Sequence, residues 1–355
     1  MFTLVLPCAG RSSRYPNMRP KWSLTHPNGS LMVTQSIAGM DLSVFTSVVV
    51  VVLREHAEKY NLTNALKESL GQKLNGQNLR VVLLDSPTSS QSETVSIAID
   101  RCKIEGAIFI KDCDGYFNVE EVEENSICVH SLQDMEEVIP KNKSYVDVDN
   151  NGFVKTIVEK RVVGELFCCG GYSFSDAKKF KESYEKISKN ITEKEIYVSH
   201  VIHQQLLDGE EFKITETKDF VDWGTLGDWN RYKKKYKTLF VDLDGVLVKN
   251  SGQYSEPKWG TTDSIKENVE VINRLYNSGK SRIIITTARK SSFKKETIDQ
   301  LKRLGIMYHN IIFDLLHCER IVINDYSPTN RYPTCRSVNL RRNSDELSSL
   351  IGDDD

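Results

Sequence analysis

The chain has 355 residues, of which 39% are hydrophobic and 27% are charged, and its formal net charge at pH 7 is −2. This length allows two domains of ordinary size, each with its own core. A charge so near zero gives no field that would attract nucleic acid or an anionic membrane, so neither partner is expected. The longest apolar run, 48–53, is too short to span a bilayer, and basic residues interrupt the region where a signal peptide would be apolar. We therefore expect a cytoplasmic protein.

Apolar runs at 3–6, 47–53, 79–84 and 107–110 predict strands, and the intervals near 31–40, 56–70 and 93–102 have the pattern of helices. This alternation is typical of a parallel α/β sheet with crossover helices. Beyond 110 the pattern loosens, with strands expected near 153–159 and 167–174 and helices near 175–188 and 198–207. The basic segment 231–237 is interpreted as a solvated helix end and a junction, which predicts two domains, 1–236 and 237–355. The eight cysteines form no C-x-x-C pairs, so buried thiols are expected rather than disulfides or zinc.

The loop after the first strand has the pattern of a phosphate site. It reads Pro-Cys-Ala-Gly-Arg-Ser-Ser-Arg over 7–14, and a Pro-Lys pair follows at 20–21. A turn of small residues exposes backbone N–H groups to an anion, and Arg11, Arg14 and Lys21 bring three positive charges to Gly10. An ordinary polar loop would not need so many cations around one glycine. The loop is therefore predicted to bind a polyphosphate.

Carboxylates follow two further strands. Asp112 and Asp114 follow the run 107–110, and Asp222 ends a predicted strand before a helix that begins near 226. The carboxyl edge of a parallel sheet presents ligands to a substrate, and Mg²⁺ screens the repulsion between two phosphates. Asp112 is favoured over Asp114 as a Mg²⁺ ligand because it is nearer the strand end, although the choice stays open. Asp222 taken alone is equally well explained as a helix cap, but with Asp112 it is a candidate second ligand.

In this order, the loop and the carboxylates resemble the sugar-phosphate nucleotidylyltransferase family over residues 2–236. The resemblance departs from the most glycine-rich members at 12 and 13, where serines stand. It implies a Rossmann-like, GT-A-like mixed sheet, an NTP and a sugar or polyol phosphate as substrates, and Mg²⁺ held by Asp112 and Asp222. It also implies phosphate contacts from Gly10, Arg11, Arg14 and Lys21, a base near Gln91, and acceptor contacts from Glu159, Lys160 and a backbone amide near Gly171. A Glu-Lys pair such as 159–160 also fits a solvated strand end.

The α/β alternation restarts at 238. Strands are predicted at 238–241, 282–286, 321–323 and 337–340, with helices at 265–277 and 293–304. This restart predicts a second doubly wound domain. The interval between Asp244 and Thr286 is short and largely helical, so it has no room for a large inserted cap. The second domain is expected to have an open site with a minimal cap.

The second domain has polar residues at the ends of three predicted strands. Asp242 and Asp244 end the first strand, Thr286 and Thr287 the second, and Asp325 the third. Asp242 is placed to attack phosphorus and Asp244 to protonate a departing alkoxide. The threonine hydroxyls would hold a phosphoryl oxygen, and Asp325 would join Asp242 and the Asp244 carbonyl around Mg²⁺.

These strand-end residues resemble those of the haloacid dehalogenase (HAD) phosphatases, over about 237–351. One departure concerns turnover: the family usually has a lysine shortly before the last acidic motif, and this chain has Arg320 there. An arginine could neutralise an aspartyl-phosphate, but its planar fork differs from an ammonium group. The resemblance implies a second Mg²⁺ site and a phosphomonoesterase activity.

The two resemblances together predict a bifunctional enzyme. One domain would remove a phosphate from a sugar or polyol, and the other would transfer a nucleotidyl group to a sugar or polyol phosphate for surface-polysaccharide precursors. The alternative is a nucleotidylyltransferase with a structural or weakly active HAD module, and a non-enzymatic nucleotide-sugar sensor is a third reading. The base, the acceptor, the order of the reactions and the oligomeric state stay open.

Overall fold

The computed structural model describes residues 1–355 except 136–141, 191–194, 326–333 and 352–355. The chain divides into two compact units, Met1–Asn230 and Arg231–Asp355. The division lies inside helix α7 (Leu226–Lys234), slightly before the junction that the basic segment suggested. Each unit is described by itself.

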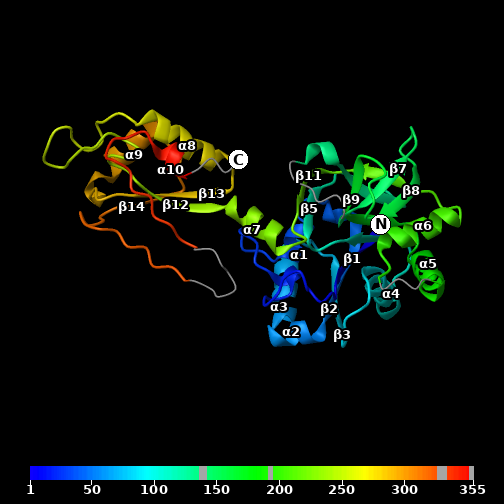
Figure 1. Ribbon diagram of the computed structural model, residues 1–355. Helices are drawn as coiled ribbons and strands as arrows, with labels where there is room; N and C mark the ends of the chain where they lie inside the picture. The colour runs from blue at the N-terminus through cyan, green and yellow to red at the C-terminus, as the bar shows by residue number, and fades with distance from the viewer. Residues whose placement is uncertain (136–141, 191–194, 326–333, 352–355) are drawn as a thin grey trace. The chain divides into compact units, whose positions relative to one another are not determined.

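Unit 1, residues Met1–Asn230, is built on a mixed sheet (Figure 1). Its parallel part has the order β4-β1-β2-β3, formed by β4 (Ile108–Lys111), β1 (Phe2–Cys8), β2 (Phe45–Leu53) and β3 (Asn78–Leu84). Beyond β4 the sheet continues with antiparallel β9 (Leu166–Phe174), then β6 (Ser126–Ser131) and β10 (Lys213–Glu216). An antiparallel hairpin, β7 (Ser144–Val148) and β8 (Val154–Glu159), joins β9 through β7. The mixed α/β sheet predicted for the N-terminal part is confirmed.

Helices cover both faces of this sheet (Figure 1). On one face, α4 (Gln91–Cys102), α5 (Ala177–Asn190) and α6 (Val198–Leu207) share a core with Val49 and Val51. On the other face, α1 (Met32–Ser36), α2 (Arg54–Lys59) and α3 (Leu62–Gly71) share a core with Val48 and Val50. The strand β2 is therefore buried on both sides, which explains its unbroken valine run. The single helix expected at 56–70 is divided at Asn61, whose φ of 50° is left-handed.

A two-stranded antiparallel ribbon that the sequence analysis did not foresee connects distant parts of unit 1. It pairs β5 (Gly115–Asn118) with β11 (Lys218–Asp222), and its register sets Asp222 opposite Gly115. The N–H of Trp223 donates to the carbonyl of Asp114 at 2.8 Å. The ribbon therefore brings the end of β11 beside the loop that follows β4.

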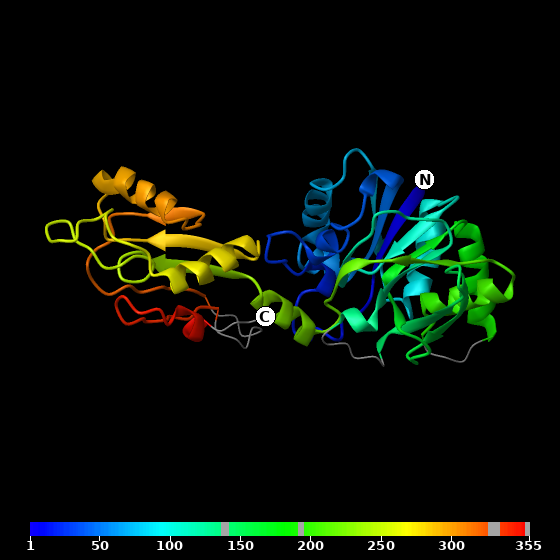
Figure 2. The ribbon, with the colours of Figure 1, turned by 90° about the horizontal axis from the view of Figure 1, so that it is seen from above.

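Unit 2, residues Arg231–Asp355, has a parallel sheet in the order β12 (Lys237–Asp242), β13 (Ser281–Thr286) and β14 (Asn310–Ile312). Figure 2 shows α9 (Lys294–Arg303) on one face of these strands, with α8 (Lys266–Asn277) and the short α10 (Leu347–Ile351) on the other. The core contains Val241, Ile283, Ile285, Ile272 and Leu301. The strand β14 was not foreseen from the sequence.

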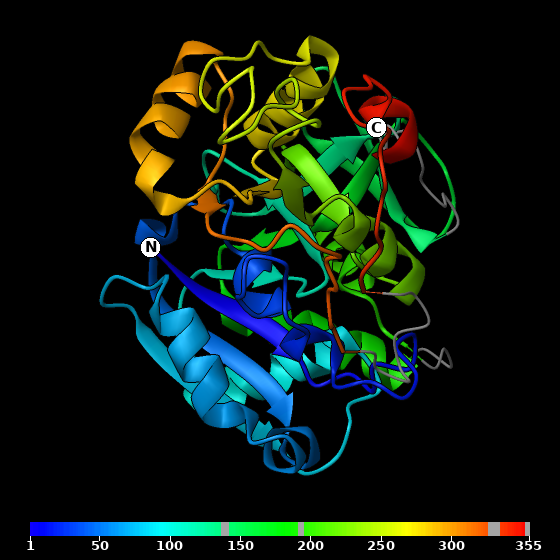
Figure 3. The same cartoon turned by 90° about the vertical axis from the view of Figure 1, so that its left-hand side faces the viewer.

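Two strands predicted for this unit, at 321–323 and 337–340, do not form. Figure 3 shows the chain from 313 to 325 (orange) as an irregular trace. Ile321 and Ile323 have 74% and 93% of their surface exposed. An apolar strand is stable only when a neighbouring strand takes up its backbone hydrogen bonds, and this segment has no such neighbour among the described residues.

Most of the cysteines are buried free thiols. Cys8, Cys113, Cys128, Cys168 and Cys169 are buried free thiols, as expected, and burial raises the pKa of Cys169 to about 12. Two further free thiols, at 318 and 335, are exposed instead. Within the described ranges, no helix combines the length and the apolar character needed to cross a membrane.

Candidate functional site

The loop after β1 is held in place by Tyr15, while its arginines are exposed. The buried Tyr15 hydroxyl donates to the carbonyls of Trp223 and, at 3.0 Å, of Thr225. Ser12 has a φ of 52°, a left-handed conformation that glycine adopts more readily, so the serine departure from the glycine-rich pattern is accommodated with some strain. Gly10 and Arg11 are exposed at the start of the loop. The anchored loop therefore leaves Gly10, Arg11 and Arg14 accessible to solvent.

Asp114 lies against the cations of this loop. The Lys21 ammonium forms an ion pair with Asp114 Oδ2, and Arg14 Nη2 lies 3.7 Å from the same oxygen. Burial alone would raise the pKa of Asp114, but the charges of Lys21 and Arg14 outweigh it and hold this pKa well below its usual range. Asp114 is therefore an anion held between two of the predicted phosphate-binding residues.

Asp222 lies beside Asp114 and has a lysine of its own. Lys143, which directly precedes β7, forms an ion pair with Asp222 Oδ2, and the Gly224 N–H donates to Asp222 Oδ1 at 2.7 Å. A Cβ atom at Gly224 would lie 2.9 Å from Asp222 Oδ1, 3.5 Å from Arg14 Nη1 and 3.8 Å from Asp114 Oδ2. The two carboxylates and Arg14 therefore surround one small space. We name Asp114 and Asp222 the carboxylate pair.

Asp112 is turned toward different partners. Its N–H donates to the Gly170 carbonyl at 2.8 Å, and its Oδ1 accepts a hydrogen bond from Gln91 Nε2. A Cβ atom at Gly170 would lie only 2.6 Å from Asp112 Oδ2. Burial, and then the neighbouring Asp114 charge, raise the pKa of Asp112. Of the two aspartates that the sequence left as alternatives, Asp114 is the one that the structure places beside Asp222, Arg14 and Lys21.

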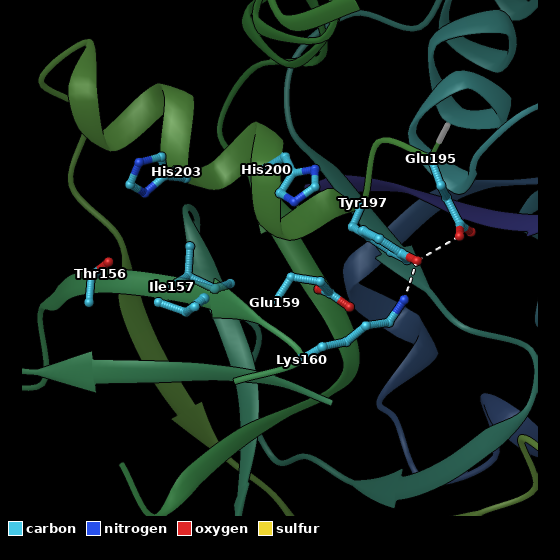
Figure 4. A pocket seen from close by; sticks show the side chains of 9 residues that line it. Thr156, Ile157, Glu159, Lys160, Glu195, Tyr197, His200 and His203 are labelled. Carbon is cyan, nitrogen blue, oxygen red and sulfur yellow. Dashed lines mark hydrogen bonds between the residues drawn. The ribbon is translucent and has the colours of Figure 1, made fainter. Parts of the chain in front are cut away.

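Glu159 and Lys160, the predicted acceptor contacts, border a cavity of about 690 Å³ (Figure 4). Ser144 and Ser199 both donate to Glu159 Oε2, the latter at 2.7 Å. Lys160 donates to the Tyr197 hydroxyl, and this hydrogen bond is the main cause of the raised pKa of Lys160. The cavity is also lined by residues of the α6 region, among them His200 and His203. One carboxylate oxygen of Glu159 is thus fixed by two hydroxyl groups.

Two further residues support the loop that carries the aspartates. Lys111 is fully buried, and its ammonium donates to the carbonyls of Asp112 at 2.9 Å and Gly115 at 2.8 Å. It also lies 4.5 Å from the centre of the Phe117 ring. Gly171 is required by packing, since a Cβ there would lie 2.7 Å from Phe117 Cζ. The sequence analysis did not single out Lys111. The one feature that could have indicated it is its position at the end of a buried apolar strand.

In unit 2, the strand register brings Asp242 and Thr286 to one edge. These residues are direct partners in the parallel pairing of β12 with β13. The Thr286 hydroxyl donates to the Val241 carbonyl at 3.3 Å, and Arg320 Nη2 lies 3.1 Å from Asp242 Oδ1. The structure therefore pairs Arg320 with the predicted nucleophile.

Asp244 is held by an arginine that the sequence analysis did not single out. Arg289 is fully buried and donates to both oxygens of Asp244 at 2.8 Å, in a bidentate ion pair. Ser251 adds a hydrogen bond to Asp244 Oδ1 at 2.7 Å, and Gln300 accepts from Arg289 at 2.8 Å. The Thr287 hydroxyl oxygen accepts a hydrogen bond from the Arg289 N–H at 3.1 Å.

Among the described residues, Asp325 forms no hydrogen bond or ion pair with Asp242, Asp244 or Thr286. It is exposed and follows the irregular segment, and its carbonyl accepts from Thr334 Oγ1 at 2.6 Å. Its arrival beside Asp242 depended on the predicted strand at 321–323, which does not form.

The N-terminal part of the chain is similar to many solved structures, among them several nucleotidyltransferases. A nucleoside-diphosphate-sugar pyrophosphorylase from Vibrio cholerae RC9 has 17% identity and a TM-score of 0.55, and the match covers 64% of this chain and 98% of that one. The inositol-1-phosphate CTP transferase from T. maritima has 16% identity and a TM-score of 0.52, with 64% and 91% covered. Unit 1 has the sugar-phosphate nucleotidylyltransferase fold.

A third match, CTP:phosphocholine cytidylyltransferase from Streptococcus pneumoniae, has 14% identity and a TM-score of 0.51, with 66% of this chain and 97% of that one covered. No protein-family model matches the sequence, and no curated protein matches it either. At these identities the likeness is one of fold. The activity of unit 1 is therefore inferred from its site.

Proposed function

We propose that the protein is a nucleotidylyltransferase that uses an NTP and a sugar or polyol phosphate and releases pyrophosphate. The observation that carries the proposal is the carboxylate pair, flanked by Lys21, Arg14 and Lys143 on a nucleotidylyltransferase fold. A reaction between two polyanions needs positive groups that are already oriented where charge develops. The neighbours that share the fold are named as a pyrophosphorylase and as cytidylyl and CTP transferases, which supports this reaction class.

The carboxylate pair fits Mg²⁺ by the chemistry of its donors. Proteins usually bind Mg²⁺ through one or two carboxylates and leave the remaining positions to substrate phosphates and water. We propose Asp114 and Asp222 as its ligands, with Asp112 orienting Gln91 rather than binding the metal. When bound there, the ion would neutralise phosphate charge.

We assign the two substrates to different side chains around the carboxylate pair. We propose that the triphosphate binds to Lys21 and Arg14 and to the exposed residues Gly10 and Arg11. Glu159, with one oxygen fixed by two serine hydroxyls, is placed to accept a hydrogen bond from a hydroxyl group of the acceptor. A carboxylate that cannot move favours acceptors whose hydroxyl group lies within hydrogen-bond distance of it. An acceptor with its hydroxyl elsewhere would leave the polar groups of the site unpaired.

The test is pyrophosphate release with the four common NTPs against a panel of sugar and polyol phosphates, with Mg²⁺ present. We expect one NTP and one acceptor class to support release, and no release without an acceptor. Absence of pyrophosphate with every combination would contradict the proposal.

Replacing Lys21 with alanine is expected to lower kcat/KM for pyrophosphate release by about a hundredfold, because a cation facing developing phosphate charge contributes a few kcal/mol. Lys186→Ala is the matched control: it removes a lysine from an exposed pair with Asp208, and such pairs contribute little. Steady-state kinetics of both variants make the comparison. Equal losses would mean that the N-terminal loop is not the triphosphate site.

We also propose that unit 2 hydrolyses a phosphate monoester, which would make the protein bifunctional. The supporting observation is the register that sets Asp242 beside Thr286 at a carboxyl edge. In the proposed reaction Asp242 attacks phosphorus, and the alkoxide leaves with a proton from Asp244, which must first exchange its ion pair with Arg289 for that proton. Water then hydrolyses the aspartyl-phosphate. A phosphatase and a nucleotidylyltransferase in one chain suit the synthesis of activated precursors for surface polysaccharide.

The phosphatase proposal depends on the segment that carries Asp325. The outer edge of β12 has no partner strand among the described residues, and Phe240 on it is 56% exposed. We propose that 321–323 pairs with this edge in the active enzyme and brings Asp325 to Asp242 and Mg²⁺. If the segment stays unpaired, unit 2 is instead a structural or weakly active module.

Replacing Arg289 with methionine is expected to weaken unit 2 by about 3 kcal/mol, because it leaves the Asp244 carboxylate without its buried partner. Hydrogen exchange followed by mass spectrometry measures this locally: amides of β12 and β13 should exchange on the order of a hundredfold faster. Arg282→Met, an exposed arginine on β13, is the control, and peptides of unit 1 are an internal reference. Unchanged exchange in β12 would contradict a structural role for the Arg289–Asp244 pair.

A further inference from the structure

We propose that Lys143, the lysine that pairs with Asp222 of the carboxylate pair, binds the phosphate group of the acceptor. The inference rests on the proposed nucleotidyl transfer and names a residue of its acceptor site. Nothing in the sequence distinguished this lysine, which lies in a lysine-rich polar stretch.

Lys143 is a largely buried cation with a defined position. Its side chain is 16% exposed, and its ammonium forms the ion pair with Asp222 Oδ2. The same nitrogen lies 5.1 Å from the centre of the Phe220 ring and 5.7 Å from that of Phe167. A charge that is removed from water needs such partners. The rings and the carboxylate together hold the ammonium at the edge of the pair.

The backbone around Lys143 leads to the predicted acceptor residues. The Lys143 carbonyl accepts the N–H of Lys160 at 2.9 Å. The next residue, Ser144, is the register partner of Glu159 and donates to its carboxylate. Lys21, in contrast, comes from the loop after β1. Two lysine–aspartate pairs therefore meet around Gly224, one from the nucleotide side and one from the acceptor side.

The proposed reaction requires a cation at this place. A phosphate oxygen of the acceptor forms a bond to the α-phosphorus of the NTP, the bond from that phosphorus to the bridging oxygen breaks, and pyrophosphate leaves with the electron pair. The attacking group is itself an anion that must approach a polyanion. A lysine ammonium is a compact charge with three donors, suited to a phosphate oxygen that must stay free to attack. Lys143 connects the carboxylate pair to the Glu159 segment, because its ammonium pairs with Asp222 and its carbonyl accepts the N–H of Lys160.

Steady-state kinetics with the substrate pair identified by the panel test the assignment. Lys143→Met is expected to raise KM for the acceptor about tenfold or more, the loss of one charged contact, and to leave KM for the NTP unchanged. Lys143→Arg, which keeps the charge, should recover part of this loss. Lys186→Met, from an exposed pair, is the control. A fall in kcat with both KM values unchanged would mean that Lys143 only positions Asp222, and would overturn the inference.

A binding measurement separates this inference from the proposed function. We would follow ³¹P NMR line widths of inorganic phosphate and of pyrophosphate in the presence of the full-length protein. Lys143→Met should lose the broadening of phosphate and keep that of pyrophosphate, whereas Lys21→Ala should do the reverse. Phosphate broadening that is absent in the wild type, or unchanged in Lys143→Met, would overturn the inference. If no substrate pair releases pyrophosphate, the proposed function fails, and this measurement still decides whether Lys143 binds phosphate.

Discussion

Replacing Asp222 with alanine is expected to lower the rate of pyrophosphate release by on the order of a thousandfold or more, because charge neutralisation at phosphate contributes several kcal/mol to the transition state. The substitution removes one of the two carboxylates around Gly224 and leaves Lys143 without its partner. Asp114→Ala is expected to have a similar effect. Rates are measured by pyrophosphate release at saturating substrates.

Two comparisons make this result specific. Asp208→Ala removes an aspartate from an exposed lysine pair of unit 1 and should leave the rate unchanged. Asp112→Ala should cost less than Asp114→Ala, because Asp112 contacts Gln91 and the backbone of Gly170 rather than the cations. A larger loss for Asp112→Ala would return the metal to that residue, as the sequence first suggested.

Replacing Asp242 with asparagine is expected to remove phosphate-ester hydrolysis completely. Asparagine keeps the shape of the side chain but lacks the anionic oxygen that attacks phosphorus and would also bind Mg²⁺. Phosphate release from a broad panel of monoesters measures the activity. Asp299→Asn, from an exposed pair on α9 of the same unit, is the control and should behave as the wild type.

Formation of an aspartyl-phosphate mimic tests the role of Asp242 as nucleophile in a second way. Wild-type protein should form a Mg²⁺-dependent complex with beryllium fluoride, a mimic of aspartyl-phosphate, and Asp242→Asn should not. If wild-type protein hydrolyses no monoester and forms no such complex, while pyrophosphate release persists, unit 2 is the structural module of the alternative reading.

The sequence predicted the parallel part of unit 1 because each strand there is locally recognisable. The valine run of β2 is buried on both faces, and a strand of that kind has no competing helical pattern. A strand ending at Asp222 was predicted, but its pairing with β5 was not predictable, since the two strands are short and far apart in the chain. The apolar pattern at 321–323 predicted a strand that does not form, because a strand also needs a partner edge, which the pattern does not report.

The site was predictable where its residues lie in local motifs. The basic loop, the aspartates after β4 and the two aspartates at the end of β12 all came from short patterns. The choice between Asp112 and Asp114 depended on contacts with Lys21 and Gly224, which lie far away in the sequence. Lys143 and Arg289 were missed because a lysine or arginine becomes distinctive only when folding buries it beside a carboxylate.

The central claim is that two separate sites in one chain carry out nucleotidyl transfer and phosphate-ester hydrolysis. The most direct measurement is of pyrophosphate and phosphate release, assayed separately on the wild type, Asp222→Ala and Asp242→Asn. We predict that Asp222→Ala loses pyrophosphate release and keeps phosphate release, and that Asp242→Asn shows the opposite. Loss of both activities in either variant, with the protein still folded, would contradict the account.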